Sequence, residues 1–597
     1  MAQNTPPDSN TPSKLRMLNV INRAARHDHL IMAALSLGVG LVTGVAVIFF
    51  REAIQWIQWA YYGTATERFY LAAETFPWWM ILLVPTAGGL LVGIFIHWTL
   101  PERRPHGIPD VIEAYARRNA FMSFRTGMAA MLASAASVGC GASVGREGPA
   151  VHLGASLTGW LTRKLDLPRP FARVILGCGV SAAVAASFNA PIAGALFASE
   201  VIIGYYALRT FAPIVIASVA GTALTRIWFG DFPAFFVSET LFASLWEFPA
   251  FLLLGIVCAI VAISFMRSIE VTQTLASKLP GPTWYRPAIA GLGVGAIALV
   301  FPHVLGVGYG LTESAMTMQF GFWMIIGIAL AKIIATALSL GFGFAGGVFS
   351  PALVIGALTG SAFGILATSV FPEFSSGPDA YALVGMGAVA AAVLGAPIST
   401  TLIVFELTGD YALTLGVMVS VVTATEITQI IFGRSFFSRQ LSRRGVNLKT
   451  EAEDEALKVN TISQIMKNDN SRIPENTPLK DVRVALQSST IGKLFVTNDD
   501  GTLLGWIKLS DLGSKAFDTS SDDATNAGSV ANSHSPILSL KNDLHMVLEL
   551  MNETSEEVIA IVDTMENMQF SGYITHHDVM QSYTRTLSQF RNEERTY

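Results

Sequence analysis

The sequence GREGP, residues 145–149, puts two charges inside a long apolar stretch. From residue 127 to 145 the chain has no ionisable side chain except Cys140, and then Arg146 and Glu147 stand between two glycines with Pro149 behind them. Ionisable side chains in a membrane are costly to bury, and they usually serve function. We therefore expect Glu147 to act and Arg146 to support it, while a plain buried ion pair is the structural alternative.

Composition identifies a membrane protein. Of the 597 residues, 51% are hydrophobic and 14% are charged, far from the balance of a soluble domain. Uncharged stretches at 30–50, 78–98, 248–266 and around 320–330 reach the length of about 20 residues that crosses a bilayer. The polar, basic segment 1–29 predicts a retained first helix rather than a signal peptide.

Charge distribution predicts orientation and partners. Basic residues precede the first apolar stretch and follow the last, which predicts cytoplasmic termini and fits a bacterial inner (plasma) membrane. The net charge of -5 gives no reason to expect nucleic acid.

The membrane region contains an internal repeat. GREGPAVHLGA from residue 145 matches GVFSPALVIGA from residue 347, and APIAGALFASE from residue 190 matches APISTTLIVFE from residue 396. The offsets, 202 and 206, are nearly equal. We therefore predict two similar halves, residues 30–240 and 241–445, an arrangement that often has inverted topology and a site where broken helices meet.

Glycine and proline indicate where those helices break. Pro149 and Pro351 suit the first turn of a helix, and the glycines before them permit tight turns. HGIPD at residues 106–110 supplies a third such break. A helix that begins in mid-membrane presents free N–H groups and a partial positive charge, which attract an anion. The pattern predicts an anion site at converging helix N-termini.

These motifs, with FNAP at residues 188–191, resemble those of the CLC family of chloride channels and proton-coupled chloride exchangers. The resemblance covers residues 30–445 and implies an α-helical membrane homodimer of inverted-repeat subunits in a lipid bilayer, each with its own pathway for chloride or a similar anion. It implies that Glu147 occupies an anion site when ionised and leaves when protonated or displaced. The anion-binding positions it implies are His106, Gly107, Ile108, Arg146, Gly148, Val348, Phe349 and Phe437.

Two of these positions depart from the family pattern. His106 stands where a serine is common, so an imidazole N–H faces the anion or, if the register differs, the ring points elsewhere. Phe437 stands where a tyrosine is common, and Phe436 takes its place if the register slips. A phenyl ring offers only a positively polarised edge.

A third departure concerns protons. Exchangers typically carry an inner glutamate where this chain has Val201, and valine cannot hold a proton. Glu200 is adjacent, but it faces about 100° away on a helix and has a repeat partner in Glu406, which favours a structural role. The sequence therefore favours passive, channel-like conduction, with proton-coupled exchange as the alternative.

A soluble region follows the membrane region. GWIKLSD from residue 505 and GYITHHD from residue 572 lie 67 positions apart, each after a helical pattern, and the repeat resembles a pair of α/β CBS domains on the cytoplasmic side. The predicted divisions are a linker at 446–461, a first motif at 462–518, a flexible linker at 519–532, a second motif at 533–590 and a tail at 591–597.

The second CBS copy offers a possible adenine nucleotide site. By the resemblance, Thr575 and Asp578 are the nucleotide-binding candidates, whereas the first copy has Lys508 where a hydroxyl is expected. Pairing of the copies without a ligand is the alternative, and no cofactor is required for transport.

Two other classes of function fit less well. An intramembrane enzyme using Glu147, His152 or His106 lacks a nucleophile or a metal-ligand cluster beside them, and the three cysteines read as small buried residues. A cation transporter with a CBS tail would need acidic residues in both halves, whereas helix N-termini favour anions. We expect no enzyme and no metal site.

Overall fold

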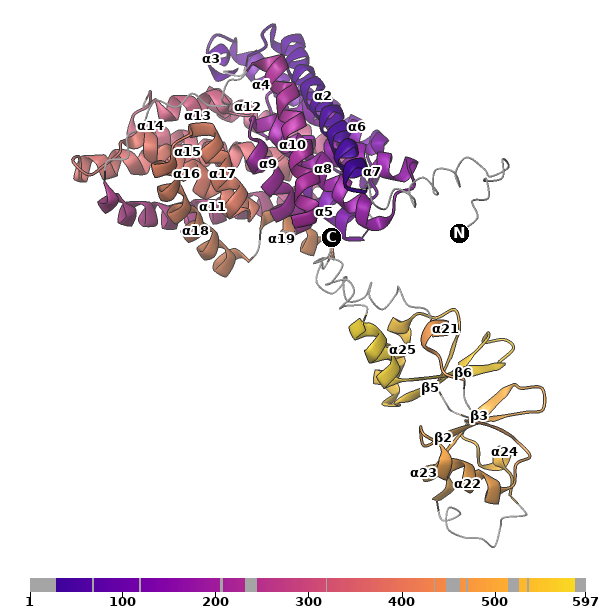
Figure 1. Ribbon diagram of the computed structural model, residues 1–597. Coiled ribbons are helices and arrows are strands. Elements are labelled where there is room, and N and C mark those ends of the chain that lie inside the picture. Colours follow the sequence, from indigo (N-terminus) through magenta and orange to yellow (C-terminus); the bar gives the residue numbers. More distant parts are fainter. Residues whose placement is uncertain are drawn as a thin grey trace, which may run out of the picture. The chain divides into compact units, whose positions relative to one another are not determined.

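The computed structural model describes residues 28–585, with gaps at 67–68, 118–119, 205–207, 231–243, 318, 434, 447–461, 469–470, 514–524 and 534–535. The chain divides into two compact units, one ending at Val446 and one beginning at Asn447 (Figure 1). The predicted N-terminal segment 1–29, the linker 446–461 and the tail 591–597 fall almost wholly outside the described residues.

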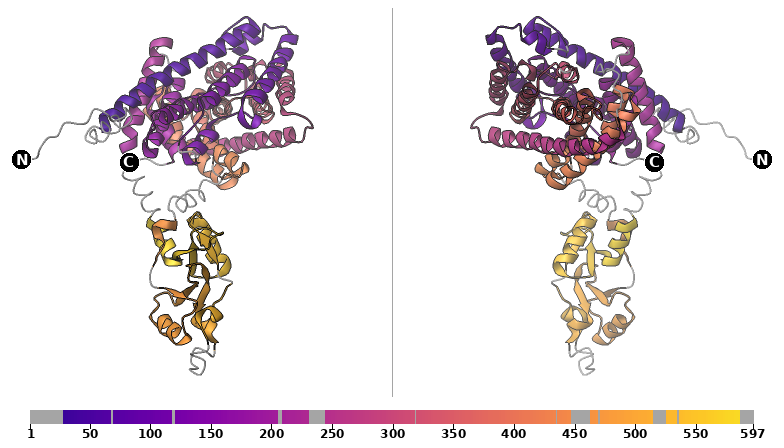
Figure 2. Two further views of the ribbon diagram at one scale, coloured as in Figure 1. Left: turned by 90° about the vertical axis from the view of Figure 1, so that its right-hand side faces the viewer. Right: turned by 90° about the vertical axis from the view of Figure 1, so that its left-hand side faces the viewer.

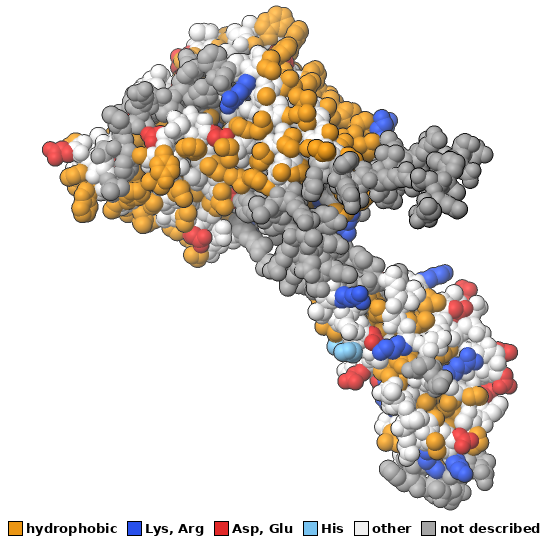
Figure 3. Space-filling model, in the orientation of Figure 1, with side chains coloured by type: hydrophobic (Ala, Val, Ile, Leu, Met, Phe, Trp, Pro, Cys, Tyr) orange, Lys and Arg blue, Asp and Glu red, His pale blue; other side chains and the backbone are white. Residues whose placement is uncertain are grey.

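The first unit is built from apolar helices. Eight of the described helical stretches are long and apolar enough to cross a membrane. Hydrophobic side chains far outnumber charged ones on its visible face, whereas charged side chains are more frequent on the second unit (Figure 3). The main helices are α2 (Asp28–Tyr62), α3 (Phe69–Ala73), α4 (Trp78–Thr99), α5 (Ile108–Arg117), α6 (Phe124–Gly139), α7 (Glu147–Lys164), α8 (Arg169–Phe188), α9 (Pro191–Phe197), α10 (Leu208–Phe229), α11 (Phe248–Ser277), α12 (Arg286–Ala298), α13 (Tyr309–Met316), α14 (Phe322–Gly341), α15 (Phe349–Val370), α16 (Pro378–Leu394), α17 (Pro397–Thr408), α18 (Tyr411–Phe432) and α19 (Phe436–Arg443).

Short helices connect these elements. The 3-10 turns are η2 (Pro101–Arg103), η4 (Leu245–Glu247), η5 (Thr283–Tyr285) and η6 (Pro302–Val304), and η3 (Ala198–Ile203) is a π-helix that continues α9.

The predicted repeat is confirmed by equivalent helix packing. In each half a helix that begins at a repeated motif packs on the next one, α7 on α8 and α15 on α16, and a short broken helix follows, α9 or α17. Asn189 and Gly395 end α8 and α16 in the left-handed conformation, and Pro191 and Pro397 then begin α9 and α17. Proline cannot continue the preceding helix, so each break lies where the sequence motif lies.

The two halves meet through matched contacts. Gly145 and Gly347 donate their N–H groups to each other's carbonyl oxygens, both at 2.8 Å. Glu200 accepts from the N–H groups at the start of α17, and Glu406 accepts from those at the start of α9. The four distances are Ile398 N to Glu200 Oε1 3.0 Å, Ser399 N to Glu200 Oε2 2.8 Å, Ile192 N to Glu406 Oε1 2.9 Å and Ala193 N to Glu406 Oε2 2.7 Å.

The second unit contains two copies of one small α/β fold. Each sheet has three strands, in the orders β1-β2-β3 and β4-β5-β6, with a parallel pair followed by an antiparallel pair. The strands of both copies lie between their helices (Figure 2). The bounds are α21 (Ile462–Ile465), β1 (Arg472–Pro474), α22 (Leu479–Ser488), β2 (Lys493–Thr497), β3 (Leu503–Lys508), α23 (Leu509–Leu512), α24 (Ala527–Val530), β4 (Ile537–Ser539), α25 (Leu544–Thr554), β5 (Val558–Val562) and β6 (Phe570–Thr575).

The flexible linker predicted at 519–532 is wrong for its described part, 525–532. That part contains α24, capped by the Asn526 side chain, and Asn532 pairs with Trp506 of β3. Ala527 is fully buried in the core of the first copy. The prediction rested on the polar composition of the segment, which does not reveal that Ala527 is buried and that Asn526 caps a helix.

Candidate functional site

Two helix N-termini converge at the contact between the halves. α7 begins at Glu147 and α15 begins at Phe349, and the paired glycines Gly145 and Gly347 lie just before them. The first N–H groups of a helix have no acceptor within it, so both termini offer donors and a partial positive charge to the same place. This arrangement attracts an anion.

A carboxylate already lies there. The Glu147 side chain is buried, and its Oε1 accepts a hydrogen bond from Tyr309 Oη at 2.5 Å. Its Oε2 accepts a hydrogen bond from the Ser350 hydroxyl. A Cβ at Gly145 would lie 2.9 Å from Glu147 Oε2, so a larger residue there would crowd the carboxylate in this position.

Arg146 supports this arrangement from beside it. Its Nε lies 4.0 Å from Glu147 Oε1, and its guanidinium lies 4.7 Å from the centre of the Tyr309 ring. A cation over an aromatic face is attracted by the ring. The buried ion pair that the sequence left as the alternative is therefore present but long, and the closer partners of Glu147 are two hydroxyls.

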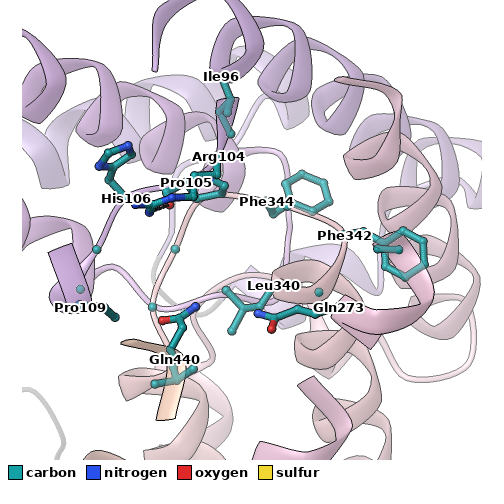
Figure 4. Close-up of a pocket in the computed structure, with 18 of the residues that line it drawn as sticks. Ile96, Arg104, Pro105, His106, Pro109, Gln273, Leu340, Phe342, Phe344 and Gln440 are labelled. Carbon is teal, nitrogen blue, oxygen red and sulfur yellow. Dashed lines mark hydrogen bonds between the residues drawn. The ribbon is translucent and has the colours of Figure 1, made fainter. Parts of the chain in front are cut away.

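A cavity of about 510 Å³ leads toward these helix starts. Pro105 and His106 lie on one side of it, and Gln273, Leu340 and Gln440 lie across from them (Figure 4). Its lining includes the predicted positions His106, Gly107, Ile108, Gly148, Val348, Phe349 and Phe437, together with Phe436 and the five arginines Arg103, Arg104, Arg286, Arg443 and Arg444. Positive charge along such a cleft raises the local concentration of anions.

The third helix start is less available than the sequence predicted. The N–H of Gly107 donates to Asp110 Oδ2 at 2.8 Å, so it is not a free anion donor. Asp110 also binds Arg104 at 2.7 Å and Arg444 at 3.1 Å. The aspartate of HGIPD thus satisfies its own helix start, which the motif alone did not reveal.

His106 lines the cavity but is oriented by the protein. Its Nε2 lies 3.3 Å from the carbonyl oxygen of Pro101, and its Nδ1 lies 3.7 Å from Asp110 Oδ1. Its ring centre lies 5.7 Å from that of His152, which is buried on α7. Both nitrogens therefore face protein atoms, as in the alternative that the ring points away from a central anion.

The inner position carries no free carboxylate. Val201 lies in the π-helix η3, and both oxygens of its neighbour Glu200 accept N–H groups at the start of α17. Phe436 and Phe437 at the start of α19 are both buried, so the two phenylalanines that the sequence offered as alternatives line the cavity together.

Tyr309 and Ser350 were missed by the sequence reasoning. Ser350 lies inside the GVFSP motif, so the sequence offered a signal for it. Tyr309 is 162 residues from Glu147 and lies in no motif that the sequence analysis used. Among the described residues, no group of three His, Cys, Asp or Glu side chains is arranged to hold a metal, and the three cysteines are buried and free.

In the second CBS copy, the predicted nucleotide residues contact each other. Thr575 Oγ1 donates to Asp578 Oδ2 at 2.6 Å, and Lys467 Nζ lies 2.7 Å from Asp578 Oδ1. Burial would raise the pKa of Asp578, but these hydrogen bonds and the lysine charge outweigh it and hold the pKa below its ordinary value.

In the first CBS copy, an ion-pair cluster takes the place of that pair. Glu556, from the second copy, binds Lys493 at 2.5 Å and Lys508 at 2.9 Å. Lys508 therefore joins the copies.

Comparison with known proteins finds a family for the first unit and for the first copy in the second unit. The voltage gated chloride channel model matches residues 88–429, and the CBS domain model matches residues 462–514. The chain belongs to the CLC family of voltage gated chloride channels. This CLC protein is an integral membrane protein, and transport of chloride or a similar small anion is its function.

Its relatives include both kinds of CLC protein. It is 33% identical over 417 residues to a putative chloride channel protein ClcB-like of Ralstonia nicotianae, covering 69% of this chain and 97% of the relative. It is 30% identical over 461 residues to the H(+)/Cl(-) exchange transporter ClcA of Yersinia pestis, covering 75% and 92%.

Solved structures share the fold. A slow cyanobacterial Cl-/H+ antiporter superposes with a TM-score of 0.62 at 22% identity, covering 71% of this chain and 99% of that one. A eukaryotic CLC transporter superposes with a TM-score of 0.60 at 19% identity, covering 92% and 98%. The helical membrane fold predicted from the sequence is thereby confirmed.

Proposed function

We propose that this CLC protein exchanges chloride for protons, with Glu147 as the group that alternates between the two. The observation that carries the proposal is the Glu147 carboxylate, buried at the helix N-termini toward which the arginine-lined cavity leads. A carboxylate and a chloride ion are both anions, so they compete for the same N–H groups.

The cycle follows from that competition. A proton that reaches Glu147 converts the carboxylate to a neutral carboxylic acid, which accepts the hydrogen bonds of the Tyr309 and Ser350 hydroxyls less strongly. The side chain then leaves, and chloride takes the vacated donors. Loss of the proton on the other side restores the carboxylate, which returns and displaces the chloride.

Sequence relatives support the coupling to protons. The ClcA relatives at 30% identity are named H(+)/Cl(-) exchange transporters, and this chain covers 92% of their length. In this chain His106 lines the cavity and lies 5.7 Å, ring centre to ring centre, from the buried His152, so the absence of a glutamate at residue 201 does not leave the region without proton acceptors.

Passive conduction, which the sequence favoured, is the competing mode. It is supported by Val201 and by Glu200, whose two oxygens are both engaged at α17. The test uses full-length protein in chloride-loaded liposomes, with valinomycin and potassium to set the potential. Exchange predicts that protons enter as chloride leaves, so the external pH rises even against a proton gradient. Chloride efflux without any pH change would establish passive conduction.

We further propose a homodimer in the inner (plasma) membrane, with both termini in the cytoplasm and no covalent catalysis. The basic residues that flank the membrane region support this orientation. Light scattering of the detergent-solubilised protein should give twice the chain mass of 64.0 kDa, after correction for detergent. Protease added to sealed inside-out vesicles, but not to right-side-out vesicles, should remove the CBS unit.

A second proposed activity is nucleotide binding at the second CBS copy. Asp578 is oriented by Thr575 and carries an adjacent lysine, Lys467, which together suit ribose hydroxyls and a phosphate. ATP, ADP and AMP titrated into the full-length protein should bind, and Asp578→Ala should abolish binding while Lys508→Thr leaves it intact. If the wild type binds none of these nucleotides, the proposed site is rejected and the two copies only pair with each other.

A further inference from the structure

Tyr309 is not among the residues that line the cavity, yet its hydroxyl contacts Glu147 directly. It is the first residue of α13, its side chain is buried, and its hydroxyl donates to Glu147 Oε1 at 2.5 Å, whereas Arg146 Nε is 4.0 Å away. A hydrogen bond to an ionised carboxylate is stronger than one to a neutral acid. The Tyr309 hydroxyl therefore stabilises the ionised, inserted form of Glu147 over the protonated form.

The backbone before Tyr309 adopts a conformation that favours glycine. Gly308 caps α13 with φ of 96°, in the left-handed region that favours glycine. A Cβ at this position would lie 2.9 Å from Val354 Cγ2 on α15 and 3.3 Å from Lys332 Nζ on α14. The loop is thus pressed between two helices, and this fixes where α13 and its tyrosine begin.

Lys332 anchors that loop from inside the membrane unit. It is fully buried on α14, one of the helices long enough to span a membrane, and its Nζ donates to the carbonyl oxygens of Val304 and Gly306, each at 2.9 Å. An ammonium group removed from water is costly, and backbone carbonyls offset that cost. Both carbonyls belong to the segment that leads into Tyr309.

Ser350 completes the hold on the carboxylate from a different element. It donates to Glu147 Oε2 from the start of α15, while Tyr309 donates to Oε1 from α13. The charged and titratable groups that face the carboxylate are thus Arg146, the residue directly before Glu147, and Tyr309 of α13. With both oxygens held, release of Glu147 requires that two hydrogen bonds break together.

We propose that Tyr309 is a positioning residue that latches ionised Glu147 in the anion pathway, and that Lys332 acts through the loop to hold Tyr309 in place. This inference rests on Glu147 being the gate. On this proposal, the pH at which transport begins depends on the strength of the hydrogen bond from Tyr309 to Glu147 as well as on Glu147 itself.

The test is the pH profile of chloride flux for full-length protein in liposomes. Tyr309→Phe keeps the ring and removes the donor, so we expect the midpoint of the rise in flux to move up by about one pH unit. Flux measured about two pH units above the wild-type midpoint should then increase about tenfold. Ser350→Ala should move the midpoint the same way. Tyr62→Phe is the matched control, because the Tyr62 hydroxyl is buried but donates to the Cys140 carbonyl, and it should leave the profile unchanged.

The anchor is tested by a double-mutant cycle. Lys332→Met should shift the profile in the same direction as Tyr309→Phe, and the double variant should shift no further than Tyr309→Phe alone, because both act through one hydroxyl. Each variant is first checked for wild-type thermal stability. Should Lys332→Met fail to fold, Lys332→Gln, which keeps a donor, replaces it in the cycle.

The two levels of failure are distinguishable. A wild-type profile in Tyr309→Phe, with a pH-independent profile in Glu147→Gln, would reject the latch and keep the gate. Additive shifts in the double variant would reject the anchoring role of Lys332. A profile in Glu147→Gln that still follows pH as the wild type does would overturn the proposed gate itself.

Discussion

The two halves of the membrane unit carry the same scaffold but differ in charge at the start of their matched helices. At an offset of 202, Arg146 and Glu147 at the start of α7 correspond to Val348 and Phe349 at the start of α15. By contrast, Glu200 and Glu406 occur in both halves and make matched hydrogen bonds. The repeated Glu200 and Glu406 each bind the helix start of the other half, whereas the unrepeated Glu147 is the carboxylate to which we assign the proposed function.

The largest expected effect comes from removing the unrepeated carboxylate. Glu147→Gln keeps the size of the side chain but cannot titrate, so proton movement should fall to the background leak and chloride flux should become independent of pH between 4.5 and 7.5. Phe349→Leu, at the repeat-equivalent position, is the control and should retain proton coupling. Coupled proton movement in Glu147→Gln would break the distinction between the halves.

The repeated glutamates should behave alike. Each caps a helix start in the opposite half, so Glu200→Gln and Glu406→Gln should each lower stability by about 1 to 2 kcal/mol. Thermal unfolding of the solubilised protein measures this, and proton coupling should persist in both variants. Loss of coupling in Glu200→Gln alone would show that Glu200 carries protons as well as capping α17.

The two CBS copies extend the comparison to a smaller effect. Burial would raise the pKa of Glu556, but hydrogen bonds from Lys493 and Lys508 outweigh it and hold the pKa below its ordinary value. The bond to Glu556 in turn raises the pKa of Lys508. Because the folded pKa of Glu556 is depressed, its contribution to stability is present above the unfolded value of 4.5 and is lost as pH falls through the folded value.

Glu556→Gln should therefore weaken the CBS unit by about 0.5 to 1 kcal/mol at pH 7 and leave it unchanged at low pH. Hydrogen exchange of the β2 and β5 amides in the full-length protein reports this stability without separating the units. The matched Glu557→Gln removes a neighbouring carboxylate that takes no part in the Lys493 and Lys508 pairs, and should have little effect. Equal destabilisation at both pH values would mean that packing, not charge, explains the loss.

Local sequence signals predicted the scaffold well because they depend on local chemistry. Proline and glycine at 145–149 and 347–351 set helix starts, and the repeat offset exposed the relation between halves. Tyr309, one of the two partners of Glu147, was not predictable in this way, since it reaches Glu147 only through tertiary packing. The contact of Asp110 with Gly107 was missed although it is local. HGIPD was interpreted as an anion site, but its own aspartate accepts the hydrogen bond of the Gly107 N–H group.

The most direct test of the account is the location of bromide, an anomalously scattering substitute for chloride, in crystals of the wild type and of Glu147→Gln. Competition for the same donors predicts that the wild type at neutral pH lacks bromide where the carboxylate lies, next to Tyr309 and Ser350. In Glu147→Gln, with the side chain displaced, bromide should appear at that position. Bromide bound there in the wild type alongside the inserted carboxylate, or a Glu147→Gln crystal with the side chain displaced and no bromide, would contradict the central claim that Glu147 and the transported anion share one site.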